Sequence, residues 1–205
     1  MESTGPKTPM VSQETISKLA TIDRKLFSWE ELFHIDLLLF SYYEAGISMA
    51  DLAYMKMSDI DGDRLNCKDC SYPNATSIPF GKEARKIVRR YKSLTEKGYL
   101  LPILGSKRLT KKQEYGCIRR LTQKANYTFR KVEKMLECER ITWRGVRLAF
   151  INKQIENGVK PIVLYALFGS ASLDVDARRP LDIYIEEYNR VFGKMVCEDS
   201  TDKGA

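Results

Sequence analysis

Apolar residues recur at helical spacing in several stretches of the chain, and the clearest stretch covers residues 141–158. One helix face there consists of Val146, Ala149, Phe150 and Ile155. Thr142 precedes this face as a helix-start residue, and Gly158 follows it as a helix-end residue. Arg144 and Arg147 stand three positions apart, so both side chains point the same way from the start of the helix. Two guanidiniums at a helix N-terminus predict a site for an anion, most often phosphate.

Further helices are expected where a polar start residue precedes an apolar face. Ser28 begins a helix over 29–44, and Glu31, three residues later, completes a capping box. Ser48 begins the next helix, over 49–55. The other stretches with a helical pattern are 11–22, 83–97, 113–137, 160–170 and 181–188.

Two short stretches between these helices have the patterns of β-strands. Residues 58–67 are divided by a turn at Asp61 and Gly62, and residues 76–80 follow a turn-rich stretch. They predict a two- or three-stranded antiparallel sheet. The expected fold class is therefore mainly α with a small antiparallel β-sheet.

The composition is that of a globular domain. Of the 205 residues, 43% are hydrophobic and 30% are charged, which is enough apolar material for one core. We expect a domain over 13–196, with a disordered lead-in at 1–12 and a flexible tail at 197–205. No apolar run is long enough to span a bilayer, and the first residues lack the pattern of a signal peptide. A cytoplasmic protein is expected.

The net charge of +7 favours an acidic partner, and double-stranded DNA is the commonest candidate. The basic residues concentrate in two stretches, which are Lys82, Arg85, Lys86, Arg89, Arg90 and Lys92, and then Lys107, Arg108, Lys111 and Lys112. Such density predicts a surface that contacts the DNA backbone. The alternative interpretation is a solvated helix face.

The cysteines and the single histidine do not predict a metal site. Five cysteines are an odd number, which argues against a closed disulfide framework. Cys67 and Cys70 form a lone CxxC, whereas a structural zinc ion needs four ligands. His34 lies inside an apolar helix and is expected to be a packed residue. No metal, cofactor or small-molecule substrate is therefore expected.

Three stretches in the C-terminal part of the chain stand in a familiar order. Arg147 opens a buried helix, Leu-Phe-Gly-Ser at 167–170 ends the next helix, and Asp-Ile-Tyr at 182–184 follows. This order resembles the C-terminal half of tyrosine recombinases, the phage-integrase family. Asp-Leu-Ala-Tyr at 51–54 is in addition similar to integrases of the gut Bacteroides type.

The resemblance covers about residues 15–193 and implies the catalytic-domain fold of the DNA breaking-rejoining enzymes. The family's N-terminal core-binding domain, which completes a clamp around DNA, has no counterpart in the sequence. We expect either a fragment or a relative that consists of the catalytic domain alone.

The resemblance also implies a reaction. In the family, a tyrosine hydroxyl attacks a DNA phosphodiester and a covalent 3′-phosphotyrosine forms, without a metal. Arginines clamp the phosphate, while a hairpin lysine and a histidine move protons. Carried onto this sequence, the nucleophile is Tyr184, with Tyr188 one helical turn on as its rival. The second arginine is Arg147, and Lys68 is nearest to the hairpin lysine.

Several positions depart from the family's pattern. Ala45 stands before Gly46, where the first arginine is expected. Arg144 and Ser170 replace two histidines, so both are expected to contact phosphate, and Arg144 cannot act as a base. The interval from Ser170 to Tyr184, 184 − 170 = 14 positions, is longer than usual. These departures predict a DNA-binding protein of integration or recombination, in a mobile element, with impaired or lost strand cleavage.

Two alternatives remain open. The first is an active site-specific recombinase that uses Tyr184 and takes its first arginine from elsewhere. The second is a non-enzymatic regulator or protein–protein adaptor on the same fold. Another integrase subunit is a further expected partner, because in the family the C-terminal segment, here 191–205, often docks onto a neighbouring subunit.

Overall fold

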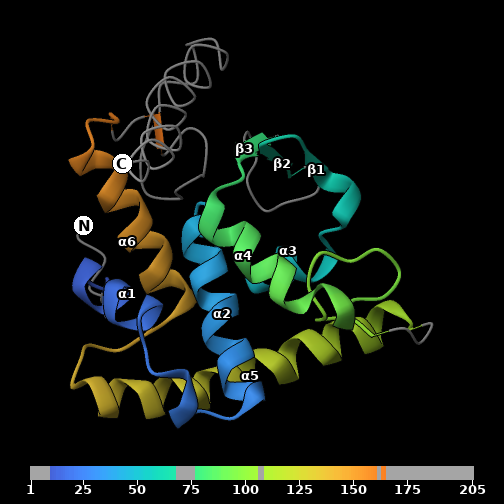
Figure 1. Cartoon of the computed structure of the whole chain (residues 1–205), viewed down its shortest axis with the longest axis horizontal. Helices are drawn as coiled ribbons and strands as arrows, with labels where there is room; N and C mark the ends of the chain where they lie inside the picture. The colour runs from blue at the N-terminus through green and yellow to red at the C-terminus, as the bar shows by residue number, and fades with distance from the viewer. Residues whose placement is uncertain (1–9, 68–76, 106–108, 161–162, 165–205) are drawn as a thin grey trace, which may run out of the picture.

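The computed structural model describes residues 10–67, 77–105, 109–160 and 163–164 (Figure 1). Its elements in chain order are α1 (Gln13–Ala20), η1 (Arg24–Leu26), α2 (Trp29–Tyr43), α3 (Met49–Tyr54), η2 (Met57–Asp59), β1 (Ile60–Asp61), β2 (Arg64–Asn66), β3 (Ser77–Pro79), α4 (Lys82–Tyr91), η3 (Lys92–Leu94), α5 (Lys111–Leu136) and α6 (Trp143–Glu156), where η marks a short 3-10 helix. The prediction of a mainly helical fold with a small antiparallel sheet is confirmed. Of the two helices predicted beyond Gly158, most of the first and all of the second lie outside the described residues.

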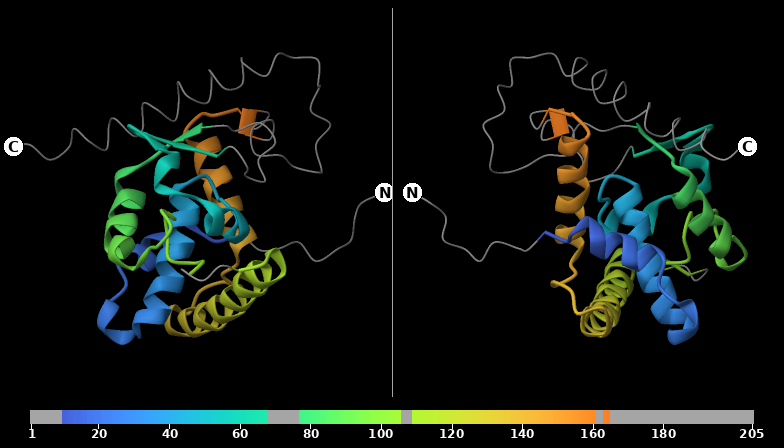
Figure 2. Two further views of the ribbon diagram at one scale, coloured as in Figure 1. Left: turned by 90° about the vertical axis from the view of Figure 1, so that its right-hand side faces the viewer. Right: turned by 60° about the vertical axis from the view of Figure 1, so that its left-hand side comes forward.

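Helix α2 is the centre of the molecule. Each residue from 33 to 41 is buried, so the helix has no solvent-facing side over this length. It packs against α1, α4, α5 and α6. Figure 1 shows α6 on one side of α2 and α4 on the other, with α5 running across the lower end of α2, and α5 lies at the bottom of the molecule in both views of Figure 2.

Local sequence signals set the starts of the helices. The predicted capping box of α2 is present, since the Ser28 hydroxyl accepts from the Glu31 N–H and the Glu31 carboxylate accepts from the Ser28 N–H. Helix α5 begins earlier than predicted, because Thr110 forms a second capping box with Gln113. These caps satisfy backbone N–H groups that no helical carbonyl can reach.

The basic helix predicted over 83–97 is shorter than expected. Helix α4 ends at Tyr91, and the 3-10 turn η3 follows. The chain then reverses at Gly98, whose φ of 71° a glycine adopts without strain. The Gly98 carbonyl accepts from the Met57 N–H at 2.8 Å. Together with the antiparallel bridge between Lys56 and Tyr99, this bond holds the segment after α4 against the segment after α3.

The sheet has three antiparallel strands in the order β1-β2-β3. Leu65 pairs with Ile60 on one side and with Ile78 on the other. Leu65 and Ile78 are buried, so one face of this small sheet joins the core. The predicted turn lies between β1 and β2, and Gly62 has a φ of 58° there.

A buried carboxylate ties α2 to its neighbours. Asp36 accepts two hydrogen bonds from the Arg24 guanidinium, at 3.0 and 2.9 Å. It also accepts from Arg90 at 2.6 Å and from the Tyr91 hydroxyl at 2.5 Å. Burial alone would raise the pKa of Asp36, but the hydrogen bonds from Arg24, Tyr91 and Arg90 hold it below its usual value. The carboxylate therefore links α2 to η1 and α4.

Replacing Asp36 with asparagine is expected to lower the free energy of unfolding by about 3 kcal/mol at neutral pH, because a neutral amide cannot accept all these hydrogen bonds. The lowered pKa means that the stabilisation is present above the ordinary pKa of an aspartate and is lost as the pH falls through the folded value. The difference between wild type and Asp36→Asn therefore shrinks on acidification. Urea unfolding at neutral and acidic pH, followed by circular dichroism, measures it.

Asp63→Asn is the matched control, because Asp63 is exposed. It is expected to change the free energy of unfolding by less than about 0.5 kcal/mol. A loss for Asp36→Asn that stays the same at acidic pH would contradict the ionised network.

Candidate nucleic-acid interface

The first turns of α6 place Arg147 against the loop that follows α2. Thr142 begins the helix, and its hydroxyl accepts from the Gly145 N–H at 2.9 Å. Arg147 lies one turn further and is half-buried. A Cβ atom added at Gly46 would lie 2.6 Å from Cγ and 2.8 Å from Cα of Arg147. The loop and Arg147 are therefore in direct contact, which only glycine permits.

This loop is a tight turn with two consecutive left-handed residues. Ala45 has a φ of 60° and Gly46 a φ of 74°. The Gly46 N–H donates to the Ser41 carbonyl at 2.6 Å, and the Ser41 hydroxyl donates to the Ile47 carbonyl at 2.6 Å. Ala45 is buried. The position where the resemblance puts the first arginine is thus one residue from the Gly46–Arg147 contact, and it presents only a methyl group.

Glu44 precedes the turn and carries a fully buried carboxyl group. One oxygen, Oε1, accepts from the N–H of Gly81, which begins α4, at 3.4 Å. The other, Oε2, has no hydrogen-bond partner among the described residues. Burial raises the pKa of Glu44 well above its usual range, although Gly81 and the charge of Arg85 act the other way. Burial thus disfavours the ionised form of the Glu44 carboxyl group.

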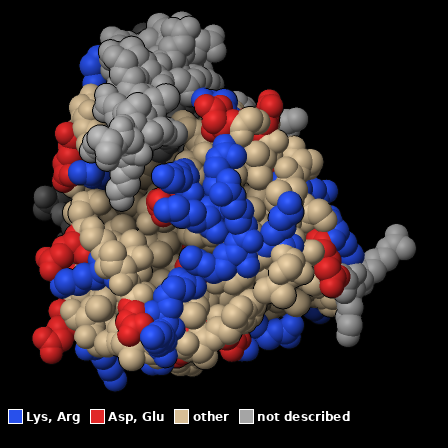
Figure 3. Space-filling view, viewed as in Figure 1, with Lys and Arg blue, Asp and Glu red and all other residues tan. Residues whose placement is uncertain are grey.

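Basic side chains gather over α4. Figure 3 shows a continuous band of Lys and Arg on the part of the surface where this helix lies. The exposed members are Lys82, Lys86, Arg89, Arg90 and Lys92. Arg89 forms no ion pair with another described residue and faces solvent, as a phosphate-contacting residue must.

Arg85, the other predicted phosphate contact on α4, has structural partners. Its guanidinium donates to the Phe80 carbonyl at 3.0 Å and to the Gly62 carbonyl at 2.7 Å. It also lies 4.5 Å from the centre of the Phe80 ring. Arg85 therefore fixes the β1–β2 turn to α4, and two of its donors are used within the protein.

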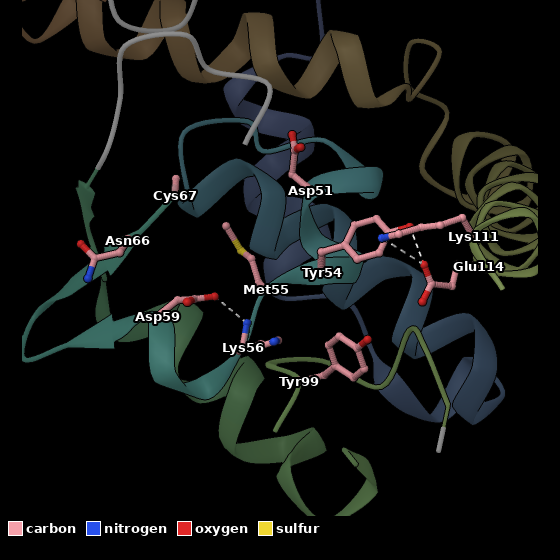
Figure 4. A pocket seen from close by; sticks show the side chains of 10 residues that line it. All are labelled: Asp51, Tyr54, Met55, Lys56, Asp59, Asn66, Cys67, Tyr99, Lys111 and Glu114. Atoms are coloured by element: carbon pink, nitrogen blue, oxygen red, sulfur yellow. Dashed lines mark hydrogen bonds and ion pairs between the residues drawn. The ribbon is translucent and has the colours of Figure 1, made fainter. Parts of the chain in front are cut away.

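Lys111 lies in a different environment from that of Arg89. It forms an ion pair with Glu114 at 3.6 Å and lies 5.0 Å from the centre of the Tyr54 ring. These residues line a pocket of about 530 Å³ between α3, β2 and α5 (Figure 4). The pocket also contains Asp51 and Asp59. Its mixed charge does not favour an anion.

Arg144 and Arg147 begin the same helix but have different surroundings. Arg144 is exposed and lines a hollow of about 250 Å³ together with Arg130 and Arg140. Neither Arg130 nor Arg140 is among the site residues predicted from the sequence. Arg140 stands four residues before Arg144 in the connection to α6, which is a visible signal, whereas Arg130 comes from α5 and only the packing of the two helices places it there.

Six of the predicted site residues lie outside the described residues. They are Lys68, Lys107, Arg108, Ser170, Tyr184 and Tyr188. Their roles stay predictions, as does the rank of Tyr184 over Tyr188.

The histidine is a packed residue, as expected. Its Nδ1 lies 2.8 Å from the Thr128 hydroxyl oxygen, and burial lowers the pKa of His34.

Within the described ranges, no group of three or more His, Cys, Asp or Glu side chains is placed to hold a metal ion. The described helices likewise include none that is both long and apolar enough to cross a bilayer.

No protein-family model matches the chain, and no curated protein sequence matches it. Among solved structures, the chain is similar to the crystal structure of XerA recombinase, with 16% identity and a TM-score of 0.49 over 89% of this chain. It is also similar to residues 82–397 of the Tn1549 transposon integrase, solved in complex with circular intermediate DNA. There the identity is 15% and the TM-score 0.48, over 98% of this chain and 69% of the other. The chain spans 65% of the length of the XerA recombinase chain.

Gly46→Ala tests the contact between the loop and Arg147. The substitution adds a Cβ atom to a left-handed residue and drives it into the backbone of α6, so a loss of about 2–4 kcal/mol of unfolding free energy is expected. Gly62→Ala is the matched control, because Gly62 has a similar φ but no atom within 4 Å of the added Cβ. Its expected loss is about 1 kcal/mol. Equal losses in urea unfolding would show that the contact is unimportant.

Proposed function

We propose that the chain is a DNA-binding protein of the tyrosine recombinase type that acts in DNA integration or site-specific recombination with impaired strand cleavage. The observation that carries the proposal is the contact between Gly46 and Arg147. The resemblance requires the end of one central helix and the start of another to meet, because the two arginines clamp the same phosphate. Helices α2 and α6 meet at those positions.

The proposed partner is double-stranded DNA. The band over α4 supplies several exposed cations, and phosphate contacts of this kind release counterions from DNA. Arg147 would contribute a planar guanidinium that can hold two phosphate oxygens at once. Such contacts position DNA without reading its sequence. We further propose a cytoplasmic location, a role in a mobile element and a second integrase subunit as a protein partner.

Impaired cleavage follows from what the loop after α2 lacks. In the proposed reaction the tyrosine hydroxyl bonds to phosphorus while the 5′-oxygen leaves, and negative charge develops on the non-bridging oxygens. Ala45 offers no hydrogen-bond donor to that charge, and one such donor is typically worth a factor of about 10²–10³ in rate. Arg144 stands where a proton-transferring histidine is expected, and a guanidinium cannot serve as a general base. Tyr184, Ser170 and Lys68 keep the roles that the resemblance implies as part of the proposal.

Duplex DNA is expected to bind with an affinity that falls steeply as salt rises, because each phosphate contact contributes about 0.9 to the logarithmic salt slope. Lys82→Gln/Arg89→Gln is expected to reduce that slope by about 1.8. Lys18→Gln/Lys153→Gln, on α1 and α6, removes the same charge from other elements and is the control. Fluorescence anisotropy of labelled duplex at several salt concentrations measures both.

Arg147→Ala is measured in the same assay and by thermal unfolding. Weaker DNA binding with an unchanged unfolding temperature supports a phosphate role for Arg147. The proposal would be overturned if the affinity for duplex DNA did not change with salt concentration. It would also be overturned if Arg147→Ala lowered the unfolding temperature but left the DNA affinity unchanged.

Strand cleavage is expected to yield little or no covalent protein–DNA complex. The assay is a denaturing gel after incubation with a duplex nicked near candidate cleavage sites, at salt concentrations where binding has been demonstrated. Tyr184→Phe and Tyr188→Phe accompany the wild type. An adduct that Tyr184→Phe abolishes would instead establish an active recombinase, and an adduct that only Tyr188→Phe abolishes would exchange the two tyrosines.

A further inference from the structure

The hollow beside the start of α6 has the composition of an anion site. The charged residues that line it are Arg130, Glu133, Arg140 and Arg144. Three guanidiniums and one carboxylate give a local charge of 3 − 1 = +2. Among the described residues, none of the three arginines forms an ion pair.

The single carboxylate of the hollow, that of Glu133, already accepts a hydrogen bond from the protein backbone. Glu133 Oε1 accepts a hydrogen bond from the Ile141 N–H at 2.8 Å, which fixes the connection between α5 and α6. This bond holds Arg140 and Arg144 near Arg130. Arg130, Arg140 and Arg144 therefore line one hollow without an acidic partner among the described residues, so an anionic ligand would balance their charge.

The surroundings of the hollow favour a phosphate group as the ligand. The indole N–H of Trp143 is buried and has no acceptor among the described residues. The hollow lies at the N-terminus of a helix of 14 residues, whose dipole favours negative charge. A volume of about 250 Å³ is below the range of pockets that enclose whole small molecules. It suits a single group that projects from a larger molecule.

An exposed aromatic ring beside the hollow favours a nucleic acid as that larger molecule. Tyr127 is 70% exposed, and the Arg130 guanidinium lies 5.7 Å from the centre of its ring. This contact orients Arg130 while leaving much of the ring open. Phosphate-binding arginines combined with exposed aromatic rings are typical of nucleic-acid contact surfaces.

We propose that Arg130, Arg140 and Arg144 together bind one backbone phosphate of DNA, at a position separate from the α4 band and from Arg147. The identification of the polymer rests on the proposed function, whereas the phosphate chemistry does not. Because the three guanidiniums share one phosphate, their contributions are coupled.

The first test uses duplex binding by anisotropy. Arg130→Gln and Arg144→Gln are each expected to weaken affinity about tenfold, and Arg119→Gln, an exposed arginine on α5 that does not line the hollow, by less than about threefold. The double variant Arg130→Gln/Arg144→Gln is expected to lose less than the product of the single effects. It is also expected to lower the salt slope by about 0.9 rather than 1.8. Losses that multiply, or that equal the Arg119→Gln loss, would overturn a shared phosphate.

The second test needs no DNA. The chain has two tryptophans, so its ¹⁵N spectrum has two indole signals, and Trp143→Phe assigns one of them. Inorganic phosphate, titrated against chloride of equal ionic strength, is expected to shift the Trp143 signal in the wild type but not in Arg130→Gln/Arg144→Gln. A shift with duplex alone supports a site that takes only a polymer phosphate, and no shift with either overturns the proposal.

The outcomes separate this proposal from the proposed function. If duplex DNA binds but the Trp143 indole signal does not shift, the hollow is not a phosphate site, while DNA binding by α4 and Arg147 still stands. If inorganic phosphate shifts the Trp143 signal to saturation but duplex DNA does not bind, the phosphate site stands and DNA is not its ligand.

Discussion

Burying α2 on every side obliges the protein to satisfy each polar group of that helix internally, and the ionised Asp36 is the most demanding of them. A buried carboxylate without partners would cost far more than one hydrogen bond returns. Arg24, Arg90 and Tyr91 meet this demand from two other elements, so the orientation of α4 against α2 is set by charge as well as by apolar packing. The basic band lies on α4, so its position depends on the buried carboxylate of Asp36.

Features that depend on neighbours in the chain were predictable from the sequence. The Ser28 capping box, the Ser48 start of α3 and the Thr142 start of α6 all act within one helical turn. The early end of α4 was not predictable from local signals, and the chain beyond it is held by a long-range backbone bond between Gly98 and Met57. Side-chain pairing between distant residues leaves even less trace in a sequence.

The arginines illustrate that limit. In the sequence, Arg85, Arg89 and Arg90 form one basic run, yet their surroundings differ. Arg85 donates to two carbonyls, Arg90 pairs with Asp36, and Arg89 faces solvent. Helical spacing shows that these side chains emerge at different angles, but it cannot show which angle meets a carbonyl or a buried acid. The same limit explains why Arg130 was missed and why the contact of Gly46 with Arg147 emerged only from the packing of two helices.

The buried carboxyl group of Glu44 has a thermodynamic consequence. Its pKa is higher in the folded chain than in the unfolded chain, so folding takes up a proton from the buffer at pH values between the two. The pKa of Asp36, on the helix that Glu44 follows, is displaced in the opposite direction, so folding releases a proton in a more acidic interval. The measured heat of unfolding will therefore contain the ionisation heat of the buffer, with opposite sign in the two intervals. Glu44 and Asp36 therefore contribute to the pH dependence of stability with opposite sign.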